Sequence, residues 1–127
     1  MIILKGLVCP AEQGLKHFSR RMREYPEVFE RATGERLYPG TLNVNIGRPM
    51  PVREHFRIRG TEINEREQDL IFEVCRINQI WAYRIRPFHL ATGGGGHGDH
   101  ILEITSSKEI PNVPPRCEVE IALFPRD

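Results

Sequence analysis

A threonine and an asparagine two residues apart form the pair in this sequence best suited to hold a metal ion. Residues 37–46 read Leu-Tyr-Pro-Gly-Thr-Leu-Asn-Val-Asn-Ile. The Pro-Gly pair predicts a turn, and the alternation after it predicts a short strand. Thr41 and Asn43 then share one face of that strand, about 6–7 Å apart. Their oxygens suit a Mg²⁺ ion that keeps several waters and completes its shell with phosphates.

The same residues also fit an ordinary polar strand face. Leu42, Val44 and Ile46 alternate with the polar positions and would face a core, which leaves Thr41 and Asn43 on the opposite side. Chemistry alone does not separate a metal site from a strand face with ordinary hydrogen bonds.

A glycine-rich stretch followed by histidines is the second unusual feature. Residues 93–96 are four consecutive glycines, and His97, Asp99 and His100 follow them. Consecutive glycines let a backbone approach a ligand closely or remain mobile. Imidazole and carboxylate groups suit Zn²⁺ or non-haem iron, but no third strong ligand lies nearby in the sequence. We therefore favour a flexible loop, and we rank a metal-dependent enzyme using His97 and His100 last.

Basic residues gather near the start of a predicted helix. Lys16, His17, Arg20, Arg21 and Arg23 lie within two helical turns. Backbone N–H groups at a helix start attract phosphate, and nearby cations strengthen that attraction. A solvated face opposite the apolar stripe explains the same pattern equally well.

Glu103 is the carboxylate most suited to acid–base chemistry. It lies in a predicted strand, where it shares a face with Ile101 and Thr105. That face meets either solvent or a polar cavity. In a cavity, the carboxylate could accept a hydrogen bond from a ligand or take the proton of an attacking hydroxyl.

The elements around these residues are mostly strands. One amphipathic helix is predicted over residues 11–25, ended by Pro26, with a short helical turn over 27–33 before Gly34. Alternating apolar residues predict strands at 2–9, 41–46, 56–58, 70–77, 80–85, 101–105 and 117–124. Asn78-Gln79 predicts a tight hairpin between two of them.

This pattern predicts a mainly β fold with some α, a small closed β-barrel with one main helix. The 127 residues form a single domain, 1–127, and show no βαβ rhythm. Trp81 and Tyr83, on one strand face, are expected in the core.

Bulk properties exclude several classes of partner. A net charge of +1 gives no field for nucleic acid. The apolar run at the start is too short for a signal peptide, and no stretch reaches the roughly 18 apolar residues of a membrane span. Cys9, Cys75 and Cys117 are expected as reduced thiols in the cytoplasm. The oligomeric state stays open.

Residues 38–44, Tyr-Pro-Gly-Thr-Leu-Asn-Val, resemble the signature of the archaeal-type, CTP-dependent riboflavin kinases. Gly6, Gly14, His97 and Glu103 extend the resemblance in order and spacing. It implies a six-stranded cradle-loop barrel and phosphorylation of riboflavin to FMN with CTP and Mg²⁺.

The resemblance also implies roles for individual residues. Thr41 and Asn43 would bind the metal, and Glu103 would be both catalytic and flavin-binding. Gly95 and His97 would complete the flavin site, and nucleotide contacts would come from Glu12, Gln13, Gly14, Leu15, Lys108, Glu109, Ile110 and Pro111.

Three positions depart from the family pattern. The glycine-rich nucleotide loop reads Pro-Ala-Glu-Gln-Gly at residues 10–14, where Glu12 adds a negative charge. Gly95 replaces a threonine, and residues 108–111 differ from the usual Leu-Arg pattern. These departures keep an alternative open: a flavin- or nucleotide-binding barrel that has lost kinase activity.

Overall fold

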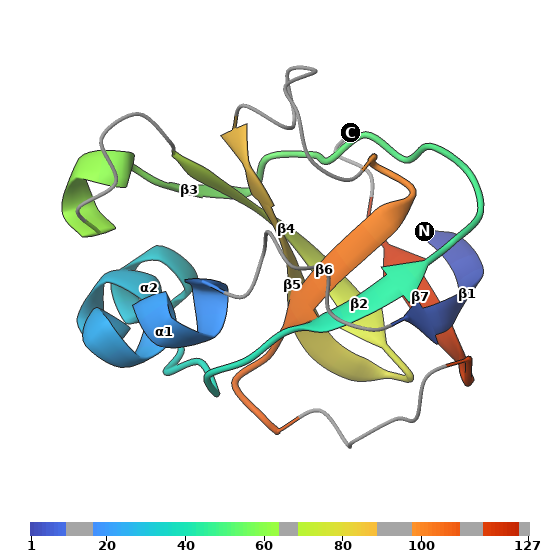
Figure 1. Ribbon diagram of the computed structural model, residues 1–127, viewed down its shortest axis with the longest axis horizontal. Coiled ribbons are helices and arrows are strands. Elements are labelled where there is room, and N and C mark those ends of the chain that lie inside the picture. Colours follow the sequence, from blue (N-terminus) through green and yellow to red (C-terminus); the bar gives the residue numbers. More distant parts are fainter. Residues whose placement is uncertain (10–16, 64–68, 89–97, 110–115, 125–127) are drawn as a thin grey trace.

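The chain folds as a barrel with two helices against one side (Figure 1). The computed structural model describes residues 1–9, 17–63, 69–88, 98–109 and 116–124. In this part of the chain the elements are β1 (Ile2–Cys9), α1 (His17–Glu24), α2 (Pro26–Thr33), β2 (Leu42–Asn45), β3 (Phe56–Ile58), a 3₁₀ turn (Gly60–Ile63), β4 (Leu70–Ile77), β5 (Ile80–Pro87), β6 (Ile101–Thr105) and β7 (Glu118–Leu123).

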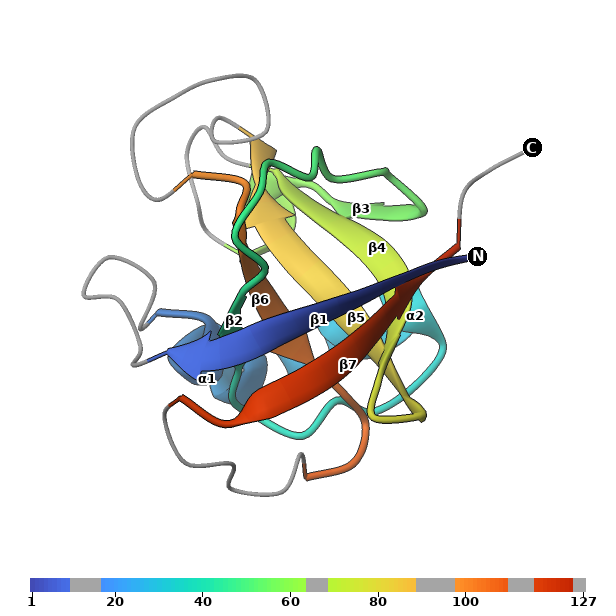
Figure 2. The ribbon, with the colours of Figure 1, turned by 90° about the vertical axis from the view of Figure 1, so that its right-hand side faces the viewer.

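Six antiparallel strands close the barrel. They are joined in the order β4-β5-β6-β2-β1-β7, and β7 pairs back onto β4. Figure 2 looks onto β1 and β7, which lie side by side. β4 changes partner along its length, from β3 at Leu70–Phe72 to β7 at Cys75–Ile77. The predicted mainly β fold with a six-stranded barrel is therefore confirmed.

The barrel interior is filled by alternate residues of its strands. The buried cluster consists of Leu4, Val8, Val44, Cys75, Ile77, Ala82, Leu102, Ile104, Val119, Ile121 and Leu123. The predicted inward face of β2 is confirmed, because Val44 is fully buried and Leu42 and Ile46 pack against this cluster. The outward face of β2, which carries Asn43, follows from the same alternation.

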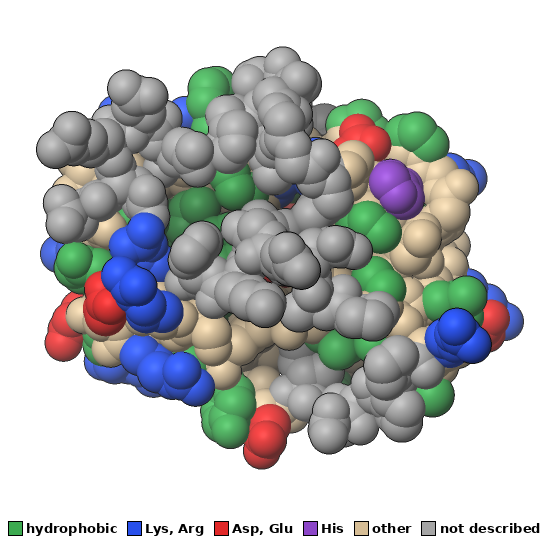
Figure 3. Space-filling model, in the orientation of Figure 1, with side chains coloured by type: hydrophobic (Ala, Val, Ile, Leu, Met, Phe, Trp, Pro, Cys, Tyr) green, Lys and Arg blue, Asp and Glu red, His purple; other side chains and the backbone are tan. Residues whose placement is uncertain are grey.

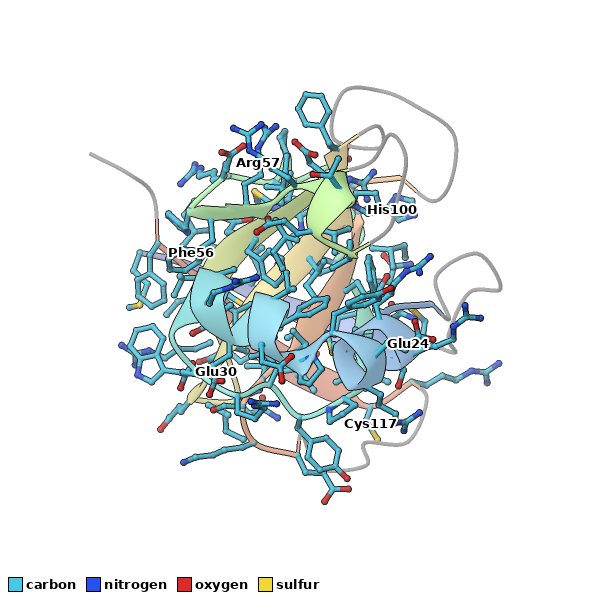
Figure 4. The ribbon with its side chains drawn as sticks, turned by 90° about the vertical axis from the view of Figure 1, so that its left-hand side faces the viewer. Glu24, Glu30, Phe56, Arg57, His100 and Cys117 are labelled. Carbon is cyan, nitrogen blue, oxygen red and sulfur yellow. The ribbon has the colours of Figure 1, made fainter. Side chains whose placement is uncertain are left out.

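A second core lies between the helices and the outer wall of the barrel. Phe18 and Met22 of α1 and Phe29 of α2 are buried with Phe72 and Tyr83 of β4 and β5. In Figure 4 the two helices lie in front of these strands. Both helices therefore cover one wall of the barrel.

The helical region agrees with its prediction in the described residues. α1 lies within the predicted helix over 11–25, and the helical turn predicted over 27–33 is α2, a helix of eight residues. Pro26 starts the second helix, because a missing N–H is harmless in a first helical turn. Gly34, with φ of 82°, ends it. The first part of the predicted helix, residues 11–16, lies outside the described residues.

Most predicted strand limits hold within a few residues. The Asn78-Gln79 hairpin is confirmed, with positive φ at both residues, as in a type I′ turn. β5 continues to Pro87. Trp81 was expected in the core and is 54% exposed, so that expectation is wrong, whereas Tyr83 is buried.

No helix within the described ranges is long and apolar enough to span a bilayer. The three cysteines are free thiols, as the sequence predicts.

Candidate functional site

Thr41, Asn43 and Glu103 come together on the outer wall of the barrel. Asn43 of β2 pairs directly with Glu103 of β6 across the sheet. Thr41, just before β2, donates its hydroxyl hydrogen to Glu103 Oε2 at 3.0 Å. Two segments about 60 positions apart in the chain thus place three oxygen-bearing side chains in one group.

Two members of this outward-facing group are buried, and Thr41 is half-buried. Asn43 is 4% exposed and Glu103 is 1% exposed. Beside them on β6, the Thr105 hydroxyl lies 3.7 Å from the sulfur of Met22, so α1 covers this part of the wall. Glu103 is therefore a buried carboxylate and not an exposed one.

The donor set fits Mg²⁺. Asn43 Oδ1 is buried and has no hydrogen-bond partner among the described residues. The Thr41 hydroxyl gives its hydrogen to Glu103 and keeps its lone pairs for another contact. Hydroxyl, amide and carboxylate oxygens are hard ligands, and Mg²⁺ sites with few protein ligands take the rest from phosphates and water.

The histidines do not form a metal centre in the described part of the chain. No group of three His, Cys, Asp or Glu side chains there is placed to hold a metal ion. Asp99 and His100 lie in the turn before β6, and His100 is exposed (Figure 4). His97 lies outside the described residues.

Cys9 is a neighbour of the site that the sequence analysis missed. As the last residue of β1, it pairs with Asn43, so Cys9, Asn43 and Glu103 form a row across β1, β2 and β6. It is half-buried. Only the strand register brings it here, and no local sequence signal indicates it.

Three buried charged residues near the site were also missed. Glu73, Arg84 and Arg86 are all at most 4% exposed. Glu73 and Arg84 pair directly across β4 and β5, with a 3.3 Å contact between Arg84 Nη1 and Glu73 Oε1. A glutamate inside the otherwise apolar run Leu70–Cys75, opposite a strand bearing two arginines, is the signal that could have found them.

Burial shapes the ionisation of this group. It raises the pKa of Glu73, against the opposing effect of Arg84. It lowers the pKa of Arg84, which Glu73 opposes. It also lowers the pKa of Arg86, against the attraction of Asp99 and Glu103. Arg86 therefore lies within the electrostatic field of the candidate site.

Lys108 and Glu109 are exposed and follow β6. The Lys108 backbone N–H donates to Ser106 Oγ at 3.3 Å. Since Leu42 pairs with Ile104, the segment that follows β6 lies at the same end of that strand as Thr41. The remaining predicted contacts lie outside the described residues: Glu12, Gln13, Gly14, Leu15, Gly95, Ile110 and Pro111.

The basic side chains of α1 lie opposite its buried stripe. Arg20 and Arg23 are exposed, and Arg20 Nε pairs with Glu24 at 2.8 Å. Figure 3 shows basic side chains gathered on the helical side of the molecule. A solvated face accounts for this arrangement, and phosphate binding there stays a prediction.

No protein-family model matches this sequence, and no curated protein matches it with significant similarity.

Proposed function

We propose that this protein is a CTP-dependent riboflavin kinase, which transfers the γ-phosphoryl group of CTP to the 5′-hydroxyl of riboflavin and forms FMN and CDP. The observation that carries the proposal is the group of oxygen-bearing side chains in which Thr41 donates to Glu103 and Asn43 pairs with Glu103 across β2 and β6. The resemblance of residues 38–44 to the family signature supports the same assignment.

Phosphoryl transfer asks a protein mainly for positioning and for stabilisation of charge. Thr41 and Asn43 would hold Mg²⁺, which neutralises phosphate charge when it is bound. The hydrogen bond to Glu103 orients the Thr41 hydroxyl, so that its lone pairs are directed away from the carboxylate. Lys108 and the arginines of α1 would add positive charge for the nucleotide phosphates.

Glu103 would serve the acceptor side of the reaction. A carboxylate accepts several hydrogen bonds, so the bond from Thr41 leaves capacity for the riboflavin hydroxyl. Glu103 would take the proton as the hydroxyl attacks.

The substrates are small molecules, and we place the reaction in the cytoplasm, where free thiols such as these three stay reduced. No nucleic acid or membrane partner is proposed.

The test is incubation of the pure protein with riboflavin, Mg²⁺ and each of CTP, ATP, GTP and UTP, followed by chromatographic separation of the flavins. We expect FMN with CTP, and none after chelation of the metal. Tight flavin or nucleotide binding without product would favour the non-catalytic module. Neither binding nor product would refute both.

A matched pair of variants makes the test local. Asn43→Leu removes the buried amide oxygen and should abolish FMN formation. Asn45→Ser is the control: Asn45 lies on the same strand but is exposed, and its Oδ1 accepts a local hydrogen bond from the Gly47 backbone N–H. This variant should keep its activity.

A further inference from the structure

The turn at residues 98–100, which leads into β6, is held by two arginines from the barrel interior. Arg84 Nη2 donates to the Asp99 carbonyl at 3.2 Å. Arg86 Nη1 lies 3.5 Å from the Gly98 carbonyl. Both arginines belong to β5 and are almost completely buried, so their guanidinium groups have little room to move.

Backbone N–H groups also donate hydrogen bonds to the carbonyls of this turn. Met50 N donates to the Asp99 carbonyl at 3.3 Å, and Ile46 N donates to the His100 carbonyl at 2.9 Å. Ile101 N closes the turn onto the Gly98 carbonyl at 3.2 Å. The three consecutive carbonyls of residues 98–100 therefore each accept at least one hydrogen bond, so the turn is firmly held.

Arg84 is itself fixed by a buried carboxylate. Glu73 Oε1 accepts hydrogen bonds from Arg84 Nη1 and from the backbone N–H of Arg53, each at 3.3 Å. Both side chains of this ion pair are 1% exposed. Stability alone does not explain such a pair, because well-packed apolar residues of similar volume often replace a buried ion pair without loss.

We infer that Arg84, held by Glu73 and assisted by Arg86, is a positioning residue that fixes the turn 98–100 and the start of β6. Glu103 lies two residues beyond that start, and its carboxylate must meet Thr41 and the acceptor hydroxyl. This role rests on the proposed kinase function, since it concerns the placement of Glu103 toward riboflavin.

The decisive variant is Glu73→Leu/Arg84→Met, which replaces the ion pair by apolar side chains of similar size. We expect a melting temperature equal to or above that of the wild type. Amide hydrogen exchange at Met50 and Ile101, which donate to the turn, should become at least about tenfold faster, while exchange at Val44 and Ile121 stays unchanged. The kcat for FMN formation should fall about tenfold or more, with a smaller change in the KM for riboflavin, because a small misplacement of reacting groups has large effects on rate.

Arg76→Met is the matched control. Arg76 also lies on the barrel, but its guanidinium stacks on Trp81 at 4.4 Å and does not reach the turn. Exchange at Met50 and Ile101 should match the wild type in this variant.

Wild-type exchange at these two amides in a folded double variant would overturn the anchoring role. Faster exchange with an unchanged kcat for FMN formation would overturn the positioning role. If the double variant does not fold, Arg84→Lys replaces it: one ammonium cannot reproduce the two-armed contact of a guanidinium. Wild-type exchange in that variant would overturn the inference. A wild type that makes no FMN refutes the proposed function, and the exchange rates still test the anchoring separately.

Discussion

Thr41 and Asn43 share a face of the barrel, yet their side-chain oxygens differ in their hydrogen bonding. The Thr41 hydroxyl already serves a buried carboxylate, whereas Asn43 Oδ1 is buried without a partner among the described residues. An unmatched buried polar atom disfavours the folded state, and removing it relieves that penalty. The two residues should therefore respond differently to loss of their oxygens.

We predict that Thr41→Val and Asn43→Leu each lower turnover by at least about a hundredfold if both residues bind the metal. Asn43→Leu should leave the free energy of unfolding unchanged or slightly higher. Thr41→Val should lower it by about 1 kcal/mol, because Glu103 loses one of its donors. Steady-state kinetics and urea unfolding measure the two effects. Parallel losses of stability and activity in both variants would indicate a purely structural pair.

Glu103→Gln separates charge from shape at the acceptor side. Glutamine keeps an oxygen that can accept the Thr41 hydrogen, but it cannot take a proton. Single-turnover phosphorylation should slow by about a hundredfold or more, with a smaller change in riboflavin affinity. Glu120→Gln, at an exposed carboxylate on β7, is the control. Weaker flavin binding with an unchanged single-turnover rate would make Glu103 a residue that only positions the substrate.

At the scale of elements, the site depends on how closely β1 approaches β2. Gly6 faces the interior between Leu4 and Val8, and a Cβ there would lie 2.5 Å from Val44 Cγ1 and 3.0 Å from the Asn45 carbonyl oxygen. Real Cβ atoms do not come so close to a neighbour, so β2 would have to move. Val44 lies directly beside Asn43 in the chain, which links this contact to the site.

Gly6→Ala should therefore lower the free energy of unfolding by about 1–3 kcal/mol through overpacking, and it should also reduce activity. Thermal or urea unfolding and the FMN assay measure these effects. Gly34→Asn is the matched control, since Asn tolerates the left-handed conformation that ends α2, where φ is 82°. A Gly6→Ala variant as stable as the wild type would show that β1 and β2 can separate without strain.

At the scale of the whole molecule, two buried acids make the fold sensitive to alkali. Burial raises the pKa of the Cys75 thiol to about 12. Burial, followed by the hydrogen bond to Glu35, raises the pKa of the Tyr83 phenol. Both groups stay protonated in the folded state at a pH where they ionise in the unfolded chain.

The sign of the effect follows from linkage. Their contribution to stability is complete below the unfolded pKa of each group, and it is lost as the pH rises toward the folded values. From about pH 9 upward, the free energy of unfolding should fall by up to about 1.4 kcal/mol per pH unit for each group. Urea unfolding between pH 8 and 11 measures this slope. Cys75→Ala and Tyr83→Phe should each flatten it, and a slope unchanged in both variants would contradict the assignment.

Local patterns predicted much of the fold. Alternation of apolar residues is a property of neighbouring positions, so it located β1, β3, β4 and β6 and identified the inward face of β2. The hairpin at Asn78 and Gln79 followed from the same kind of signal. Pro26 was predicted to end the first helix, and it also starts the second, because its missing N–H is harmless in a first helical turn.

Only part of the candidate site could be predicted from the sequence. Thr41 and Asn43 stood out because they are two residues apart on one strand. Their meeting with Glu103, the row that includes Cys9, and the anchorage by Arg84 all depend on strand register, which joins residues far apart in the chain. The prediction that Trp81 is buried was wrong for the same reason, since β5 has a core on each side and only the packing of the helices shows which outward residues are covered.

The sequence by itself determined the strands, their two faces and the oxygen-bearing pair at Thr41 and Asn43, because these follow from interactions between near neighbours. Only the tertiary structure decided that the barrel closes through β4 and β7, that Glu103 is buried beside Asn43, and that a buried ion pair anchors the turn before β6. The physical reason is that burial and pairing are set by contacts between distant segments, which no local spacing encodes.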